Sequence, residues 1–296
     1  MNEFVYQLPQ VFPEGRLPNV AIMVTGAGAS KPFTAIATNA IPNYHFLDTG
    51  QCFPLYAYTP VDDTEGLNFG EADTIDGYRR RDAISDAALK MFQAAYGPKV
   101  TKEDIFYYVY GVLHSPEYRT RFASNLKKEL PRIPLTKNAD DFRTFAKAGR
   151  GLAAWHLEYA GIEPYPLDEQ CDTLALDPER LYAVTKMTYA RPTAEQKAAG
   201  QKWDKSRIIY NSHITLRGIP PEALAYAVNG KPAIEWVMER YQITVDKDSG
   251  IRNDPNDWSK EHKQPRYIID LVKRVVRVSV ETVKIVNTLP ALNERI

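Results

Sequence analysis

The stretch Thr101–Arg121, TKEDIFYYVYGVLHSPEYRTR, predicts two consecutive helices and anchors the fold of the chain. It opens with Thr101-x-x-Asp104, a variant of the capping box with Asp in place of the usual Glu. Apolar side chains then recur at the spacing of one helical face: Ile105, Tyr108, Val109, Val112 and Leu113. A second helix restarts at once, because Ser115 can cap it and Pro116 suits its first position.

Short strands precede this helical stretch. We expect them within residues 20–58, at Val20–Val24, Phe33–Thr38 and Phe53–Tyr58, because each run is apolar and bounded by Pro, Asn or Gly. Asp82 is a candidate cap for a helix that ends at Gly97, and Asp141 for a later one.

Beyond Pro178 the pattern changes again. Tyr182–Tyr189 and Arg207–Leu216 are short β-type runs, and the polar insert between them, Thr193–Lys205, resembles a long hairpin tip. The last helix should begin after Pro265 and end near Asn287. These elements predict an α+β class with short mixed β-sheets, helical bundle segments and a long C-terminal helix. We divide the chain into a β-rich part (1–80), a helical part (81–177) and an α+β part (178–296).

Composition indicates an ordinary globular chain of 296 residues, with 37 basic and 37 acidic residues and no net charge. Zero net charge argues against a simple basic nucleic-acid binder, yet the charges are unevenly placed. Acidic residues gather within 62–76, and basic residues within 119–150. Such bipolarity suits DNA on one side and a partner domain on the other, or simply two solvated faces.

The same sequence predicts a soluble, cytoplasmic protein. Its two cysteines, Cys52 and Cys171, lie far apart without metal-type spacing, which fits a reducing cytosol. We find neither a signal peptide nor the roughly 18 apolar residues that a membrane span requires.

The sequence contains no recognisable catalytic or metal-binding motif. Gly26–Lys31 (GAGASK) follows an apolar run, but its spacing departs from G-x-x-x-x-G-K-[ST], and we interpret it as a tight turn. Asp246–Asp257 departs from the EF-hand pattern because Gly250 occupies the fifth position. The histidines and cysteines lack zinc spacing, and no methyltransferase tetrapeptide or G-x-S-x-G is present.

One region suits DNA. The polar insert and its flanks carry amide and basic side chains that can reach base edges from a hairpin or loop: Lys197, Gln201, Lys202, Lys205, Arg207, Asn211 and His213. An ordinary solvent-facing hairpin explains the same residues equally well.

Several blocks together resemble the C-terminal part of Type ISP restriction–modification enzymes. They are GAGASKPF (26–33), QCFPLYAY (51–58), the opening stretch 101–121, LPRIPL (130–135), ITLRGI (214–219), VNGKPAIEWVMERY (228–241), DKDSGIRNDPNDW (246–258) and the closing helix. In that family one polypeptide carries a nuclease, an ATP-driven translocase, an adenine-N6 methyltransferase and a target-recognition region. The resemblance implies that this chain is the last region, and that 1–80 can include the end of the methyltransferase fold. The family's catalytic blocks are missing.

The resemblance therefore implies a non-catalytic chain that recognises a short asymmetric sequence of duplex DNA, without a cofactor of its own. S-adenosylmethionine, ATP and Mg²⁺ would belong to the parent enzyme, whose methyltransferase and translocase modules are the expected partners. From charge clustering and loop placement we expect phosphate contacts from Lys31, Arg119, Arg121, Lys127, Lys128 and Arg132, and base contacts from Lys202, Lys205, Arg207, Asn211 and His213. Two alternatives are a scaffold that only docks the methyltransferase, and an enzyme that binds nucleotide or S-adenosylmethionine at the glycine-rich turn.

Overall fold

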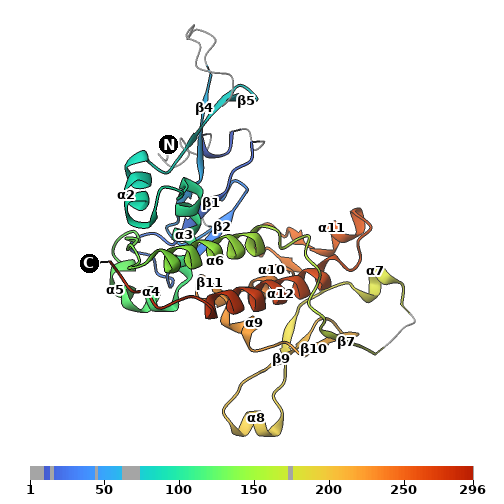
Figure 1. Ribbon diagram of the computed structural model, residues 1–296. Coiled ribbons are helices and arrows are strands. Elements are labelled where there is room, and N and C mark those ends of the chain that lie inside the picture. The colour runs from blue at the N-terminus through green and yellow to red at the C-terminus, as the bar shows by residue number, and fades with distance from the viewer. Residues whose placement is uncertain (1–9, 14–16, 44–45, 62–73, 173–175, 296) are drawn as a thin grey trace. The chain divides into compact units, whose positions relative to one another are not determined.

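A computed structural model describes residues 10–13, 17–43, 46–61, 74–172 and 176–295 (Figure 1). The chain forms two compact units. Unit 1 comprises residues 1–157 and 285–296, and unit 2 comprises 158–284. The predicted parts 1–80 and most of 81–177 thus share one unit, because the N-terminal strands pack on the helices that follow them.

Unit 1 contains two three-stranded antiparallel sheets. The first has the order β2-β1-β3, formed by Ala35–Thr38, Ala21–Val24 and Gln51–Pro54. The second has the order β4-β6-β5, formed by Tyr56–Pro60, Tyr78–Asp82 and Thr74–Ile75. The single strand expected at 53–58 is therefore two strands in different sheets, which part at the buried Leu55.

The helices of unit 1 follow: α2 (Asp86–Tyr96), α3 (Lys102–His114), α4 (Pro116–Arg121), α5 (Ala123–Leu126) and α6 (Ala139–Leu157). The capping box of α3 is confirmed, since the Asp104 backbone N–H donates to Thr101 Oγ1 at 3.1 Å and the Thr101 backbone N–H to Asp104 Oδ2 at 3.0 Å. The Ser115 cap of α4 is also confirmed.

Two predicted caps were wrong. Ser85, and not Asp82, caps α2, while Asp82 pairs with Lys102 at 3.2 Å. The helix α6 begins at Ala139, ahead of Asp141, and the Asp141 N–H donates to Asn138 Oδ1 at 2.8 Å. In each case a second polar residue nearby has the better geometry for the exposed N–H groups of the first turn.

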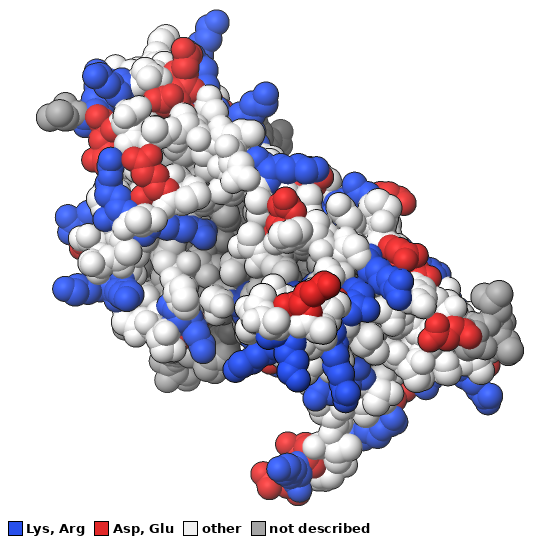
Figure 2. All heavy atoms as spheres, turned by 90° about the horizontal axis from the view of Figure 1, so that it is seen from below, with Lys and Arg blue, Asp and Glu red and all other residues white. Residues whose placement is uncertain are grey.

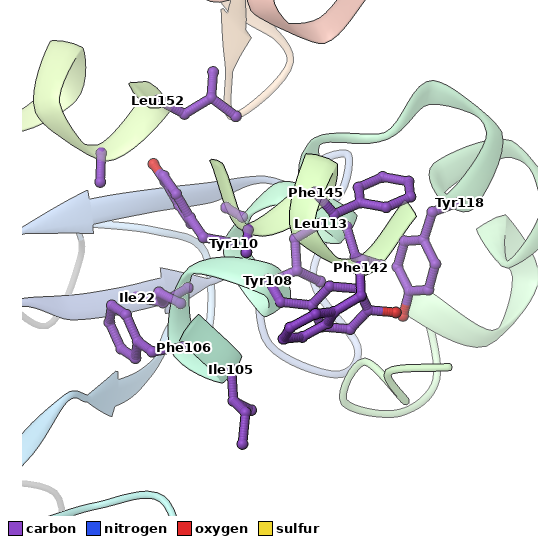
Figure 3. Packing of buried hydrophobic residues seen from close by; sticks show 14 of the residues in the cluster. Ile22, Ile105, Phe106, Tyr108, Tyr110, Leu113, Tyr118, Phe142, Phe145 and Leu152 are labelled. Carbon is purple, nitrogen blue, oxygen red and sulfur yellow. The ribbon is translucent and has the colours of Figure 1, made fainter. Parts of the chain in front are cut away.

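Close packing of α3 on α6 organises the core of unit 1. The helices approach at Gly111 and Gly149, where an added Cβ would lie only 2.2 Å from the Phe145 oxygen and 1.8 Å from the Tyr107 oxygen, respectively. Large aromatic rings belong to the same core, among them Tyr108, Tyr118, Phe142 and Phe145, which Figure 3 labels, and also Phe92 and Tyr96. The glycines permit the contact, and the rings stabilise it by burial.

The C-terminal segment also belongs to unit 1. Thr136 and Glu294 form an antiparallel bridge, and the Lys137 N–H donates to the Asn293 oxygen at 2.7 Å. Leu292 is buried in the same core. This tail explains why the first unit is built from two separate parts of the chain.

Unit 2 is built on a four-stranded antiparallel sheet of order β7-β10-β9-β8. Its strands are Asp168–Cys171, Ile214–Arg217, Asp204–Ile209 and Thr188–Ala190. The core residues Ile208, Ile214 and Leu216 come from its two central strands, and Tyr210 directly follows β9. The amphipathic helix α12 (Tyr267–Asn287) supplies the facing apolar side chains Ile268, Ile269, Val272, Val276 and Val280. Its start after Pro265 and its end at Asn287 are as predicted.

Shorter elements complete unit 2. They are α7 (Pro178–Leu181), α8 (Ala194–Ala198), α9 (Glu222–Ala225), β11 (Ala227–Val228), β12 (Lys231–Pro232), α10 (Ala233–Arg240), β13 (Thr244–Val245), β14 (Arg252–Asn253) and α11 (Asn256–Glu261). The prediction of a strand at 182–189 was wrong over most of its length, because the only strand in this range, β8, begins at Thr188. The α+β class with short sheets and a long C-terminal helix is confirmed, and every strand pair among the described residues is antiparallel.

Candidate nucleic-acid interface

In the glycine-rich turn between β1 and β2, backbone N–H groups donate to the carboxylate of Asp48. Asp48 Oδ2 accepts from the Ser30 N–H at 2.7 Å, the Ser30 hydroxyl at 2.8 Å and the Lys31 N–H at 3.1 Å. These bonds hold the pKa of Asp48 below its usual value. A phosphate-binding turn would offer such donors to its ligand. The tight-turn interpretation therefore fits the structure better than a nucleotide site.

The turn packs beside α4 and α5. Gly28 has a φ of +74°, and its N–H donates to the Lys127 oxygen at 3.0 Å. The Arg119 guanidinium lies 5.8 Å from the centre of the Phe33 ring. These two contacts place Lys31 on the same part of the unit 1 surface as Lys127 and its neighbour Lys128. All three lysines are exposed. The turn and the end of α5 thus form one cationic patch, which we call the lysine patch.

The arginines predicted for phosphate contact have other partners. Arg119 Nε donates to the Leu113 oxygen at 2.7 Å. Arg121 pairs with Glu117 at 3.2 Å and Glu294 at 2.9 Å, and so fastens the C-terminal tail. Arg132 pairs with Glu129 at 2.8 Å, but its side chain remains 86% exposed. Arg119 and Arg121 are therefore held by the fold, whereas Arg132 retains a solvent-facing charge.

The polar insert of unit 2 is an ordered hairpin, which we define as residues 188–209 and call the α8 hairpin. It projects from the sheet with α8 at its tip (Figure 1). Thr193 and Gln196 form a capping box at the start of α8. Gly200, with φ of +79°, turns the chain back toward β9 and donates its N–H to the Lys197 oxygen at 3.0 Å. The sequence insert is therefore a preformed element, not an open loop.

Asp204 joins the two sides of this hairpin. Its buried carboxylate accepts from the Ser206 N–H at 3.1 Å and from Arg207 Nε at 2.6 Å. Although burial opposes ionisation, hydrogen bonds from Ser206, Arg207 and Gln196 lower the pKa of Asp204 to about 2. Because Gln196 belongs to α8 and Arg207 to β9, the charge fixes the tip relative to the sheet.

The residues predicted to contact bases divide into engaged and exposed groups. Lys205 pairs with Glu235 at 2.8 Å, and Arg207 with Asp204. The amide of Asn211 donates to the oxygens of Leu181 and Ala183 at 2.8 and 2.9 Å, and its oxygen accepts from the N–H groups of His213 and Ile214 at 2.9 and 2.8 Å. Asn211 therefore holds the β9–β10 turn with its full hydrogen-bonding capacity.

Lys202 remains exposed at the tip, and His213 is half-buried at the β9–β10 turn. The sequence analysis missed Trp203, whose ring is 50% exposed beside Lys202. A lone tryptophan within an otherwise polar insert was the signal that could have indicated it, because a large exposed ring commonly marks a contact surface.

Charge is distributed in local groups. On the face drawn in Figure 2, Lys and Arg side chains lie among Asp and Glu side chains, and neither sign covers the face continuously. The acidic stretch predicted at 62–76 lies mostly outside the described residues, which resume at Thr74. On this face, the positive charges form local patches and not one continuous basic surface.

The Asp-rich loop near 246–257 forms a turn. Asp246 Oδ1 accepts from the Ser249 N–H and the Asp248 N–H at 2.8 and 3.2 Å, inside the β13–β14 hairpin. Across the described ranges, no group of three His, Cys, Asp or Glu side chains is placed to hold a metal ion. None of the described helices combines the length and the apolar character needed to cross a membrane.

Comparison with known proteins places this fold. The sequence model of the family described as "Type ISP C-terminal specificity domain" matches residues 1–271. The chain belongs to this family. A comparison with curated proteins finds no match.

Three solved structures share the fold of the specificity domain. A nuclease-deletion mutant of the Type ISP restriction–modification enzyme LlaGI, in complex with a DNA substrate mimic, is 32% identical with a TM-score of 0.73. The ATP-dependent Type ISP enzyme LlaBIII bound to DNA is 30% identical with a TM-score of 0.78. DrdV in a DNA complex solved by cryoEM is 37% identical with a TM-score of 0.76. Each match covers 98% of this chain but only 23%, 17% and 26% of those chains, respectively.

Proposed function

We propose that this specificity domain selects a short, asymmetric sequence of duplex DNA for a Type ISP restriction–modification enzyme. The observation that carries the proposal is the family match over residues 1–271, supported by three neighbours whose structures were solved with DNA or a DNA mimic. A scaffold that merely docks a methyltransferase would not need a preformed polar hairpin with exposed side chains at its tip.

The lysine patch would contact phosphates. Lys31, Lys127 and Lys128 are exposed, and Arg132 adds a fourth solvent-facing charge nearby in sequence. Phosphate contacts orient a protein on the duplex without reading its sequence. Arg119 and Arg121 would act indirectly, by fixing the position of α4.

The tip of the α8 hairpin would contact base edges. Gln201, Lys202 and Trp203 are exposed there, and amide and ammonium groups suit the hydrogen-bonding groups of the major groove. We assign His213 a contact at the edge of this region. Lys205, Arg207 and Asn211 would position the tip, because their polar groups bond within the fold.

The catalytic steps would belong to other modules of the parent enzyme. We propose that methyltransferase, translocase and nuclease modules, with S-adenosylmethionine, ATP and Mg²⁺, act on the DNA that this domain selects, and that this chain itself is non-catalytic and works in the cytoplasm. The turn at Asp48 supports this division, since the Ser30 and Lys31 N–H groups and the Ser30 hydroxyl already donate to the Asp48 carboxylate.

A selection from a randomised duplex library tests the proposal with the purified chain. We expect enrichment of one short asymmetric motif, and weaker discrimination by Lys202→Ala. Lys260→Ala is the matched control, because Lys260 is an exposed lysine of α11 in the same unit. No enriched motif, with binding that disappears at modest salt, would remove sequence recognition.

A further inference from the structure

An open cleft of about 400 Å³ lies between the α8 hairpin and α10 in unit 2. Its apolar lining comes from Trp203, Tyr189, Met187 and Met238, and its polar lining includes Glu235 and Gln242. Pockets for small ligands combine such apolar walls with a few placed polar groups, in roughly 300–1,000 Å³. We propose that this cleft receives a single unstacked nucleobase of the bound DNA, and the proposal rests on the function proposed above.

Trp203 supplies a stacking surface on a rigid support. Half of its surface is exposed, whereas Met187 and Met238 beside the cleft are buried. The residue directly after it is Asp204, whose buried carboxylate ties the tip to β9. A ring carried on an ordered backbone segment adds little backbone entropy loss on binding, and base–aromatic stacking tolerates any base because each has a π-face.

Glu235 and Gln242 supply the polar edge. Glu235 Oε1 accepts from Lys205 at 2.8 Å and from the Tyr189 hydroxyl at 3.1 Å, which fixes the carboxylate beside the cleft. No partner of the second oxygen of Glu235, or of the Gln242 amide, is found among the described residues. A carboxylate oxygen accepts from the exocyclic amino group of adenine or cytosine, and an amide both donates and accepts.

The ionic side chains at the cleft favour a base over a free anion. Lys231 pairs with Glu239 and also lies 4.4 Å from the centre of the Trp236 ring, while Glu235 is paired with Lys205. Within each ion pair the opposite charges neutralise each other. The remaining cation of the lining is Lys186, which lies exposed at the rim. A neutral ring inside and one phosphate at Lys186 match this arrangement. Since Lys202 and Trp203 are adjacent, DNA that reaches the tip also reaches the cleft.

Mismatch scanning of the duplex enriched by the library selection tests this subsite. Each base pair of that duplex is replaced in turn by a mismatch, and the affinity of the full chain is measured by fluorescence anisotropy. A mispaired base leaves its stack more easily. We therefore expect one position where the mismatch tightens binding several-fold. Trp203→Ala should abolish that gain and weaken binding about ten-fold, whereas Trp203→Phe should retain most of both.

Trp258→Ala is the matched control, because Trp258 is an exposed tryptophan of the same unit outside the cleft lining, and it should keep the mismatch preference. If a motif is enriched but no mismatch tightens binding, or if Trp203→Ala keeps the gain, the subsite is refuted while sequence recognition stands. If no motif is enriched, both proposals fail.

Discussion

Replacing Gly149 by alanine should destabilise unit 1, whereas the same change at Gly151 of the same helix should not. The new Cβ would lie 1.8 Å from the Tyr107 oxygen and 2.9 Å from the Gly111 nitrogen, both backbone atoms of α3. Ordinary contact begins near 3.4 Å, so the two helices must separate by about 1.6 Å, the difference between these distances. Backbone atoms cannot rotate away as a flexible side chain can.

The magnitude follows from the rings beside the crossing. A gap of 0.5–1 Å already forfeits a quarter to a half of each dispersion contact, and overpacked cores lose about 1–3 kcal/mol, occasionally more. Phe142 and Phe145 on α6, and Tyr108 on α3, are buried at this contact. The better helix propensity of alanine returns about 1 kcal/mol. Because the clash is with backbone atoms, we take the upper end of the overpacking range and expect a net loss of about 2 kcal/mol.

Gly151→Ala gives a control in the same helix. Its Cβ would meet only the terminal methyl of Ile285, at 3.3 Å, so the propensity gain should dominate and leave unit 1 as stable or up to about 1 kcal/mol more stable. Urea unfolding followed by circular dichroism gives the free energies, and hydrogen exchange of α3 and α6 amides assigns the change to unit 1. Equal stability of the two variants would refute the packing argument.

Three further outcomes are expected. Lys127→Ala and Lys128→Ala should each weaken binding to all duplexes evenly and reduce the slope of log affinity against log salt by about 1, measured by titration at several salt concentrations; a sequence-dependent loss would contradict a phosphate role. Lys202→Ala should relax preference at one position of the selected motif with little change in that slope, and unchanged selectivity would remove it from the base contacts. Burial of the neutral rings of His114 and His156 lowers both pKa values, that of His156 to about 3. Below pH 6.5 the unfolded state therefore binds more protons than the folded state. The free energy of unfolding should be about 2 kcal/mol lower at pH 5 than above pH 6.5 through His156 alone. Urea midpoints that stay constant from pH 7 to 5 would contradict this.

Local sequence signals predicted the helices of unit 1 well where capping and periodicity agree. The Thr101 and Ser115 caps depend on atoms within a few residues, so they can be identified without tertiary information. The split of 53–58 into two strands could not be predicted, because it depends on which neighbour each half pairs with: β3 with β1, and β4 with β6. The docking of the C-terminal tail could not be predicted either, because its partners Thr136 and Arg121 are distant in sequence.

The residue types of the candidate site could be predicted from the sequence, whereas the hydrogen-bond partners of those residues could not. Lys205, Arg207 and Asn211 have the chemistry of base contacts, yet each is bonded inside the fold, because an ordered hairpin needs the same donors and acceptors that bases do. Sequence alone gives the inventory of polar groups, whereas partner distances decide which groups remain available. Trp203 is the opposite case: its residue type suggests burial, but the tertiary structure leaves its ring exposed.

The division between bonded and exposed groups supports the recognition role proposed for the α8 hairpin. A flexible polar loop would lose conformational entropy in every complex, cognate or not, and would adapt to many sequences. Asp204 restricts that freedom, because its buried carboxylate accepts hydrogen bonds from both α8 and β9. In the proposed function, the exposed side chains at the tip would meet a wrong base pair with a fixed geometry. Specificity would then depend on Asp204 and Arg207, which fix the hairpin, as well as on Lys202 and Trp203.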